Sequence, residues 1–500
     1  MINILVLTKG QCRRITFIFV SASLLFWYCY SSLGNNFEDA GLVGMTFQLL
    51  SFFVCLILFQ NRDSERLTVG NIDVLFSLVC LCYLLFPSII WLTKSEINIQ
   101  YGGYVTEEIG TLLCWLHGLY FLAFVAGYSI LSRPSHNFRT FCKIQIPPGF
   151  LLLIVAIIVL VLIVIIRQVL STGQFLPQQD RGISTLESYE AGIKSIQMGG
   201  LRLIFHQILN KLTEFNFLFL GIGIGLVYAK SASKKLRSLF LLIITVLATS
   251  LFVVFTGGGR GPGLIVMLMG LVFFDYIMGP VRWRYLFVLI LIGLVGAEFI
   301  AYARFLTGDS YNSLSDWVSY WMDTGDKFFE LTVMFGKEAV VVSEVKSTGE
   351  FWGLIYFPQI FLKIIPQQLM PLKSQFPSVS EWLSDLLLTS DMIERGSGLA
   401  GTAIGEGYLV GGVPGVAIIG GMTGLILGLV QRWLLGSNDT RLWQLIPLVY
   451  VAGNLLFVLR SDLYSLLNTM ILGVLPLWLF LRSISRWLGP ASLWNQHIYT

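Results

Sequence analysis

Long apolar runs recur along almost the whole of this 500-residue chain, and they constrain its fold more than any other feature. A helix needs about 17 to 25 mainly apolar residues to cross a hydrocarbon core about 30 Å thick. Twelve runs qualify: 15–31, 41–59, 72–93, 108–131, 149–166, 213–229, 238–256, 264–279, 285–303, 402–430, 443–459 and 464–481. Isolated strands would leave backbone groups unpaired in lipid. The runs therefore predict one integral membrane domain over residues 1–500, all-α and polytopic, with about twelve transmembrane helices.

The composition excludes several other classes of protein. Hydrophobic residues make up 55% of the chain and charged residues 12%, with a mean hydropathy of +0.75. A soluble domain has about a quarter of its residues charged. A net charge of +4 over 500 residues is too small for a nucleic-acid-binding surface. The seven cysteines lie in the first third of the chain without a ligand-like histidine partner, so we expect neither a disulfide framework nor a zinc site.

The distribution of lysine and arginine predicts the orientation of the spans, since short cytoplasmic loops are enriched in positive charge. With twelve spans, seven basic segments fall on one side: Lys9, Arg13 and Arg14; Arg62 and Arg66; Arg133, Arg139 and Lys143; Lys230, Lys234, Lys235 and Arg237; Arg282 and Arg284; Arg432 and Arg441; Arg482 and Arg486. Both termini are therefore expected in the cytoplasm. The first span is expected to be a retained anchor, because no convincing cleavage site precedes Asn35.

Three of the connections expected on the opposite, non-cytoplasmic side are longer than the others, and two of these are sizeable. Residues 304–401 carry seven positive and twelve negative side chains, a net charge of about −5. Within them, aromatic residues at helical spacing over 317–329 and an apolar stretch over 353–371 predict short helices lying on the membrane face. Residues 167–212 form the smaller outer loop. A structured loop as long as 304–401 is usually functional, although a solvated cap is the alternative.

Three arginines lie on the outer side, where the charge rule disfavours them. Arg260 stands in a glycine-rich turn with Gly258, Gly259 and Gly261, Arg304 follows the ninth span, and Arg460 follows the eleventh. Each could be a membrane anchor. A guanidinium is also a planar fork of donors suited to phosphate, and glycines leave backbone amides open to an anion. The turn lacks the lysine and Ser/Thr of a P-loop, so no nucleotide is implied.

A second glycine-rich segment, residues 396–415, contains Glu406 about one turn inside the tenth predicted span. An ionisable residue in such a place is a functional candidate. Glu298 in the ninth span competes for this role, although the hydroxyl of Tyr302 one turn away could satisfy it. The later glycines at 420, 424 and 428 have the spacing of a helix-packing stripe, and we favour that structural interpretation.

These motifs resemble those of the Wzy-type oligosaccharide repeat-unit polymerases of O-antigen, common-antigen and capsule assembly. The resemblance rests on the Gly-Gly-Arg turn at 257–263, the large outer loop, and Gly-x-Gly-Glu-Gly-Tyr followed by Gly-Gly-Val-Pro-Gly within 396–415. It implies a GT-C-like glycosyltransferase of the bacterial inner membrane. Such an enzyme moves a glycan from one undecaprenyl pyrophosphate carrier to the sugar end of a second lipid-linked repeat unit in the periplasm. A chain-length co-polymerase is a further partner that it suggests.

The resemblance also implies roles for individual residues. Arg260 and Arg304, supported by Arg460, would stabilise the departing pyrophosphate. Glu406 would be the general base, and Tyr408 or the outer-loop aromatic residues would pack the sugar. Metal-dependent relatives carry an acidic pair in the first outer loop, and Glu38-Asp39 occupies that place here. Two acids alone are a weak signal of a metal site, so no metal or other cofactor is expected.

One departure leaves the identity of the base open. The related O-antigen ligases use a histidine of their large outer loop, and residues 304–401 contain none. His206 in the smaller outer loop is the remaining outer histidine. A different class of function, a polytopic transporter or a lipid-linked oligosaccharide flippase, also suits twelve spans. It fits less well because the unusual charges gather at the outer rim and no internal repeat is visible.

Overall fold

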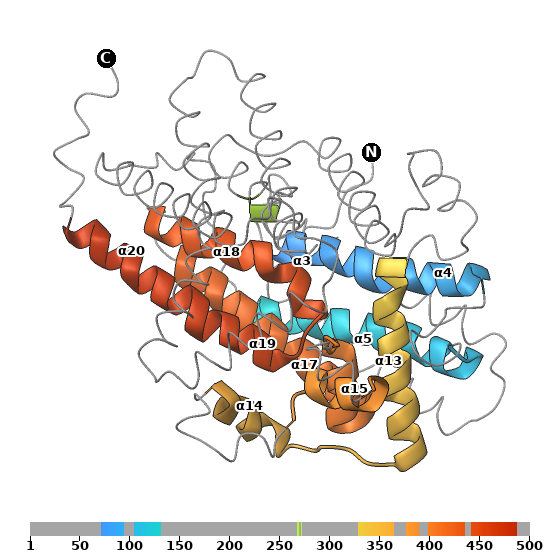
Figure 1. Ribbon diagram of the computed structural model, residues 1–500. Helices are drawn as coiled ribbons and strands as arrows, with labels where there is room; N and C mark the ends of the chain where they lie inside the picture. Colours follow the sequence, from blue (N-terminus) through green and yellow to red (C-terminus); the bar gives the residue numbers. More distant parts are fainter. Residues whose placement is uncertain are drawn as a thin grey trace, which may run out of the picture.

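The computed structural model describes residues 72–94, 105–131, 268–269, 272, 329–364, 377–389, 399–435 and 442–487. Regular structure in these ranges is entirely helical (Figure 1). The helices are α3 (Ile72–Cys80), η1 (Leu81–Leu85), α4 (Phe86–Lys94), α5 (Glu107–Leu131), α13 (Phe329–Thr348), α14 (Tyr356–Ile364), α15 (Val379–Leu387), α17 (Ala403–Leu435), α18 (Leu442–Leu459), α19 (Leu463–Asn468), η3 (Thr469–Val474) and α20 (Leu475–Trp487). The prediction of an all-α chain is confirmed for this part.

Five of the predicted spans fall within the described ranges, and each is helical. Residues 72–93 form α3, η1 and α4; 108–131 form α5; 402–430 lie in α17; 443–459 lie in α18; and 464–481 form α19, η3 and α20. Among the residues that the structure describes, three helical segments are long and apolar enough to cross a membrane, namely Glu107–Leu131, Ala403–Leu434 and Leu463–Ser483. The chain is therefore compatible with a helical membrane protein. Six other predicted spans lie outside the described residues, and 264–279 is described at three positions.

The centre of the bundle is the pairing of α5 with α17, which lie side by side. The glycines of α17 allow this close approach: a Cβ atom at Gly420 would lie 2.6 Å from the carbonyl oxygen of Tyr120, and one at Gly424 would lie 2.1 Å from that of Phe124. Gly127 of α5 meets the carbonyl of Gly421 in the same way. The predicted packing stripe is confirmed at Gly420 and Gly424, since small residues let two backbones touch.

Gly424 of the stripe and the nearby Gly421 outside it give a stability prediction. We expect Gly424→Ala to lower the free energy of unfolding by about 2 kcal/mol, because its methyl group would push α17 away from the backbone of α5. Gly421→Ala is the matched control, since the nearest atom to its new Cβ would be the Ala123 carbonyl oxygen at 3.9 Å. It should be neutral or slightly stabilising. Thermal unfolding of the two purified variants in detergent measures the difference. Equal melting temperatures would contradict the close packing.

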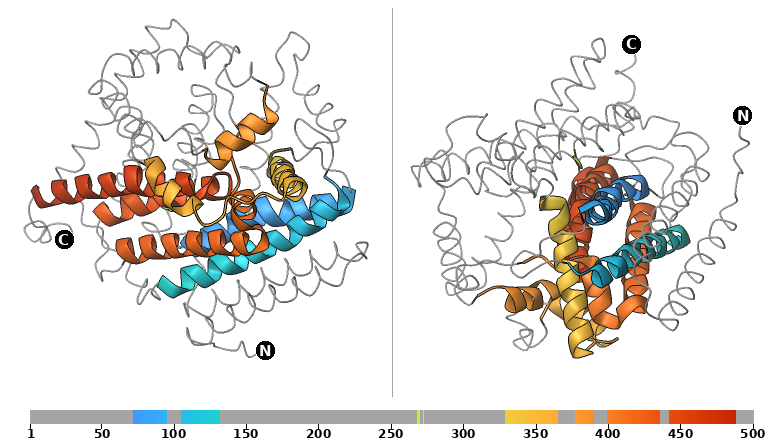
Figure 2. Two further views of the ribbon diagram at one scale, coloured as in Figure 1. Left: turned by 90° about the horizontal axis from the view of Figure 1, so that it is seen from below. Right: turned by 90° about the vertical axis from the view of Figure 1, so that its right-hand side faces the viewer.

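Helix α13 runs across the bundle instead of along it, in Figure 1 and in the right-hand view of Figure 2. It contacts α4, α5 and α17, and its apolar side chains are buried, among them Phe335 and Val342. The Phe335 ring stacks on Trp91 of α4, with ring centroids 6.2 Å apart. The predicted outer loop therefore sends a helix into the core. This helix was not among the short helices predicted in the loop.

Three contacts join α13 to residues at or near the ends of other helices. Lys346 at the end of α13 pairs with Glu108 at the start of α5, and Lys337 Nζ donates to the carbonyl oxygen of Ala400, just before α17. Trp91 at the end of α4 contacts Phe335. The charge pattern assigns these three ends to the outer side, and they lie together. The side of the membrane they face stays a prediction.

Two further helices form in the large loop. Helix α14 confirms a helix within 353–371, and its Tyr356 and Ile360 are buried. Helix α15 begins with a capping box, in which the Ser378 side chain accepts from the backbone N–H of Glu381 and the Glu381 carboxylate accepts from that of Ser378. Whether α14 lies on the membrane face stays a prediction. Two large exposed side chains just before α14, Leu354 and Ile355, fit that prediction.

Candidate functional site

Helix α17 is broken near its beginning by the predicted Gly-Gly-Val-Pro-Gly motif. Gly411 has φ −169° and ψ 33°, and Gly412 has φ 63° and ψ −143°, so neither residue is helical. Pro414 has no N–H to give the carbonyl of Val410, its partner in a regular helix. The sequence predicted one continuous span over 402–430. The structure instead gives two helical pieces with freed carbonyl groups at the junction.

The large loop that the charge pattern predicts on the outer side supplies the missing donors at this break. The backbone N–H groups of Trp352 and Gly353 donate to the carbonyls of Leu409 and Val410, each at 2.9 Å. Irregular backbone within a membrane helix is tolerated where other protein groups pair it. The segment that precedes α14 is therefore joined to α17 through main-chain hydrogen bonds.

The adjacent glycines of the break make a second stability prediction. Gly412 lies at a positive φ that L-residues rarely adopt, and its Cβ would also lie 3.3 Å from the Phe351 ring, so we expect Gly412→Ala to cost about 1–3 kcal/mol. Gly411 has an extended φ and nothing within 4 Å of its Cβ position. Gly411→Ala should change stability by less than about 0.5 kcal/mol. Thermal unfolding compares them, and a larger loss for Gly411→Ala would refute the assigned conformation.

Glu406 lies one turn into α17, as predicted, and it is fully buried. Its Oε1 accepts a hydrogen bond from the Tyr356 hydroxyl of α14 at 2.6 Å. Its Oε2 accepts from the backbone N–H of Leu463, the first residue of α19, at 2.8 Å. One carboxylate thus joins α14 of the large loop, the entry of α17 and the start of α19. We call these three elements the carboxylate joint.

The Tyr356 hydroxyl remains a donor at this joint. Burial, the carboxylate of Glu406 and the nearby carboxylate of Asp462 all raise its pKa above the ordinary tyrosine value. The hydroxyl is therefore protonated at physiological pH and stabilises the Glu406 carboxylate.

Asp462 is the second acid of the carboxylate joint, and its side chain is 1% exposed. It caps α19: its Oδ1 accepts from the backbone N–H of Ser465 at 3.0 Å and from the Ser465 hydroxyl at 2.6 Å. Its Oδ2 has no hydrogen-bond partner among the residues the structure describes. Buried polar atoms without partners are rare, and functional sites are one of the places where they occur.

Aromatic side chains of the outer loop lie next to the joint. The Trp352 ring is 5.3 Å from that of Tyr356 and 6.3 Å from that of Trp382 on α15, measured between ring centroids. Trp352 and Trp382 are both partly exposed. Aromatic faces beside carboxylates suit the apolar faces and hydroxyls of a sugar ring.

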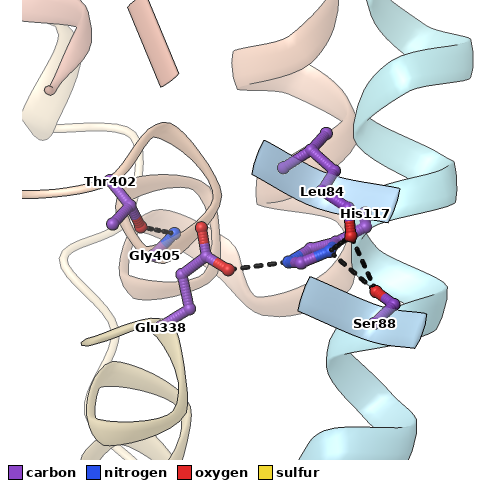
Figure 3. Close-up of polar contacts among 6 residues, drawn as sticks. All are labelled: Leu84, Ser88, His117, Glu338, Thr402 and Gly405. Atoms are coloured by element: carbon purple, nitrogen blue, oxygen red, sulfur yellow. Dashed lines mark hydrogen bonds and ion pairs between the residues drawn. The ribbon is translucent and has the colours of Figure 1, made fainter. Parts of the chain in front are cut away.

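A second buried polar cluster lies where α13 crosses α5 (Figure 3). Nε2 of His117 on α5 is 2.7 Å from Oε2 of Glu338 on α13, and the side chains are 0% and 2% exposed. Nδ1 of His117 lies 3.1 Å from the carbonyl oxygen of Leu84, which can only accept, so Nδ1 carries a hydrogen. Nε2 and Oε2 therefore share a hydrogen bond that joins α5 to α13.

The predicted site residues are only partly within the described ranges. Arg460 lies between α18 and α19, two residues before Asp462, with its guanidinium carbon 5.8 Å from the centre of the Tyr83 ring. Tyr408 is buried in α17 at 7% exposure. The remaining predicted residues lie outside the described residues: Arg260, Arg304, Gly258, Gly259, Gly261, Glu298 and His206.

Sequence reasoning missed four residues of these two clusters: Tyr356, Asp462, His117 and Glu338. His117 offered a signal, since it is an ionisable residue in the middle of a predicted span. Asp462 follows Arg460 in the short turn between two predicted spans, where an aspartate is expected simply to cap the next helix. Within the described ranges, no three His, Cys, Asp or Glu side chains come together as metal ligands.

No family model matches the chain, and neither the curated proteins nor the solved structures include a significant match to it. The function is therefore inferred from the motifs and from the chemistry of the carboxylate joint.

Proposed function

We propose that the protein polymerises undecaprenyl-pyrophosphate-linked oligosaccharide repeat units on the periplasmic side of the bacterial inner membrane, with both termini in the cytoplasm. The observation that carries the proposal is the carboxylate joint. It brings buried acids from the Gly-x-Gly-Glu-Gly-Tyr motif and from the α18–α19 turn together with a tyrosine of the large outer loop. The resemblance to Wzy-type polymerases implies functional roles for the motif, for this turn and for the large loop.

The reaction needs three kinds of group. The pyrophosphate that leaves the donor carries negative charge, which Arg260, Arg304 and Arg460 would stabilise through bidentate hydrogen bonds. The acceptor hydroxyl must lose a proton to a carboxylate, and Glu406 and Asp462 are the two candidates at the joint. The sugar needs a packing surface, for which Trp352 and Trp382 are the more open aromatic residues and Tyr408 the more buried one. The mechanism proposed here uses no metal or cofactor.

The test is reconstitution with a single substrate. The purified full-length protein is incubated with a lipid-linked repeat unit in detergent or liposomes, without nucleotide sugar. A ladder of longer glycans on the lipid carrier, with release of undecaprenyl pyrophosphate, is the expected result. A substrate that stays at one repeat unit while the protein is folded would overturn the proposal.

The His117–Glu338 pair favours a second candidate, a transporter or flippase driven by protons. Ionisable residues buried in membrane helices often mark ion pathways, and this pair joins α5 to α13. Under this alternative, proteoliposomes would translocate a lipid-linked oligosaccharide in response to a pH gradient and would make no ladder. Replacement of His117 by glutamine would then abolish the response to the gradient.

A further inference from the structure

We infer that Asp462, and not Glu406, is the general base that takes the proton from the acceptor hydroxyl. This inference rests on the proposed polymerase function and assigns one step within it. It follows from the hydrogen bonds that each carboxylate already makes.

The oxygen of a general base that takes the proton needs a lone pair that no protein donor already uses. Each Glu406 oxygen already accepts from a protein donor, the Tyr356 hydroxyl at 2.6 Å and the Leu463 N–H at 2.8 Å. The Asp462 Oδ1 is likewise occupied, by Ser465. Asp462 Oδ2 is the oxygen of the two side chains that has no donor, within the ranges the structure describes. A sugar hydroxyl would supply the hydrogen bond that this buried oxygen lacks.

The position of Asp462 fits this role. It lies in the turn between α18 and α19, two residues after Arg460, so a phosphate-binding cation and an acid share one short connection. Its Oδ1 contacts to Ser465 fix the carboxylate, so that Oδ2 is held in one orientation. Glu406 is then a positioning residue, because it holds the start of α19 and thereby Asp462 against the outer loop.

The chemical step balances with these groups alone. The O–H bond of the acceptor sugar breaks, and its proton moves to Asp462 Oδ2. The acceptor oxygen uses the freed electron pair to form a bond to the anomeric carbon of the donor glycan. The bond between that carbon and the pyrophosphate oxygen breaks, and its electron pair leaves with undecaprenyl pyrophosphate. The proton on Asp462 is then released to water.

Two amide substitutions separate the acids without removing their structural contacts. Asparagine caps helices about as well as aspartate, so Asp462→Asn keeps the bonds from Ser465. In Glu406→Gln, the amide oxygen can accept from Leu463 N–H while the amide NH₂ donates to the Tyr356 hydroxyl, which also accepts. Asp385→Asn is the matched control, since Asp385 is an exposed acid on α15.

The experiment measures ladder formation by the purified full-length variants over a range of substrate concentrations. We expect Asp462→Asn to lower kcat by roughly 10² to 10⁴ with KM and melting temperature near those of the wild type. Glu406→Gln should lose less than about tenfold, since both its contacts persist, and Asp385→Asn should be unchanged. If Asp462→Asn does not purify in folded form, Asp462→Ser replaces it, because serine also caps helices.

Several outcomes would overturn the inference. A wild-type rate for the Asp462 variant, or a loss in Glu406→Gln equal to or larger than that in Asp462→Asn, would return the base to Glu406 or to another residue such as His206. A wild-type protein that makes no ladder would instead refute the proposed function itself. The two failures are therefore distinguishable in one set of reactions.

Discussion

Replacing His117 by alanine is expected to destabilise the protein by about 3–5 kcal/mol, because it leaves the buried Glu338 carboxyl without its partner. The loss should exceed that of any surface substitution and should lower the yield of folded protein. Thermal unfolding and size-exclusion chromatography in detergent measure it. Glu338→Ala should have a similar effect, since it strands the imidazole in the same way.

Two controls define what the His117–Glu338 pair contributes to the stability of the folded protein. The double substitution of His117 and Glu338 by leucine should be closer to the wild type than either alanine variant, because apolar groups need no hydrogen-bond partner. Lys346→Ala breaks an exposed ion pair with Glu108 that likewise joins α13 to α5, and it should cost no more than about 1 kcal/mol. If His117→Ala were as mild as Lys346→Ala, the pair would not hold α13 in place.

The substitutions Arg260→Lys and Arg304→Lys are each expected to lower ladder formation by about 10²-fold, the usual cost of removing one stabilising donor from a developing anion. Lysine keeps the positive charge but lacks the planar fork that binds two phosphate oxygens. Initial rates of ladder formation, normalised to folded protein, are the measurement. Arg282→Lys, in a predicted cytoplasmic loop, is the matched control and should keep the wild-type rate. Normal ladders from both outer variants would make these arginines membrane anchors.

Features that depend on one helix were predictable from the sequence. The apolar runs located five described helical spans, and the glycine spacing predicted the packing stripe at Gly420 and Gly424. Glu406 was recognised because it stands alone in an apolar run, and it lies one turn into α17, as expected. Each of these signals is local, because consecutive residues determine helical periodicity and span length.

The contacts that build the site were not predictable, because they join residues far apart in the chain. The partners of Glu406 are 50 and 57 residues away, and His117 is 221 residues from Glu338. Helix α13 was missed because its charged residues, such as Lys337 and Glu338, mark a surface segment, whereas tertiary contacts cover both. The sequence shows the Gly-Gly-Val-Pro-Gly motif but does not predict that α17 breaks there. The break is stabilised by backbone N–H groups of the distant loop, which a local pattern cannot reveal.

The break in α17 also sets an order of assembly. The carbonyls of Leu409 and Val410 receive hydrogen bonds from Trp352 and Gly353, which are synthesised earlier but lie in a different element. Until that loop segment has folded onto α17, these carbonyls need another donor such as water, because a buried carbonyl without a donor costs several kcal/mol in lipid. The first piece of α17 can therefore leave the aqueous phase only as a unit with the loop. Pairing of the loop segment with the break would then be a late step in the folding of this part of the protein.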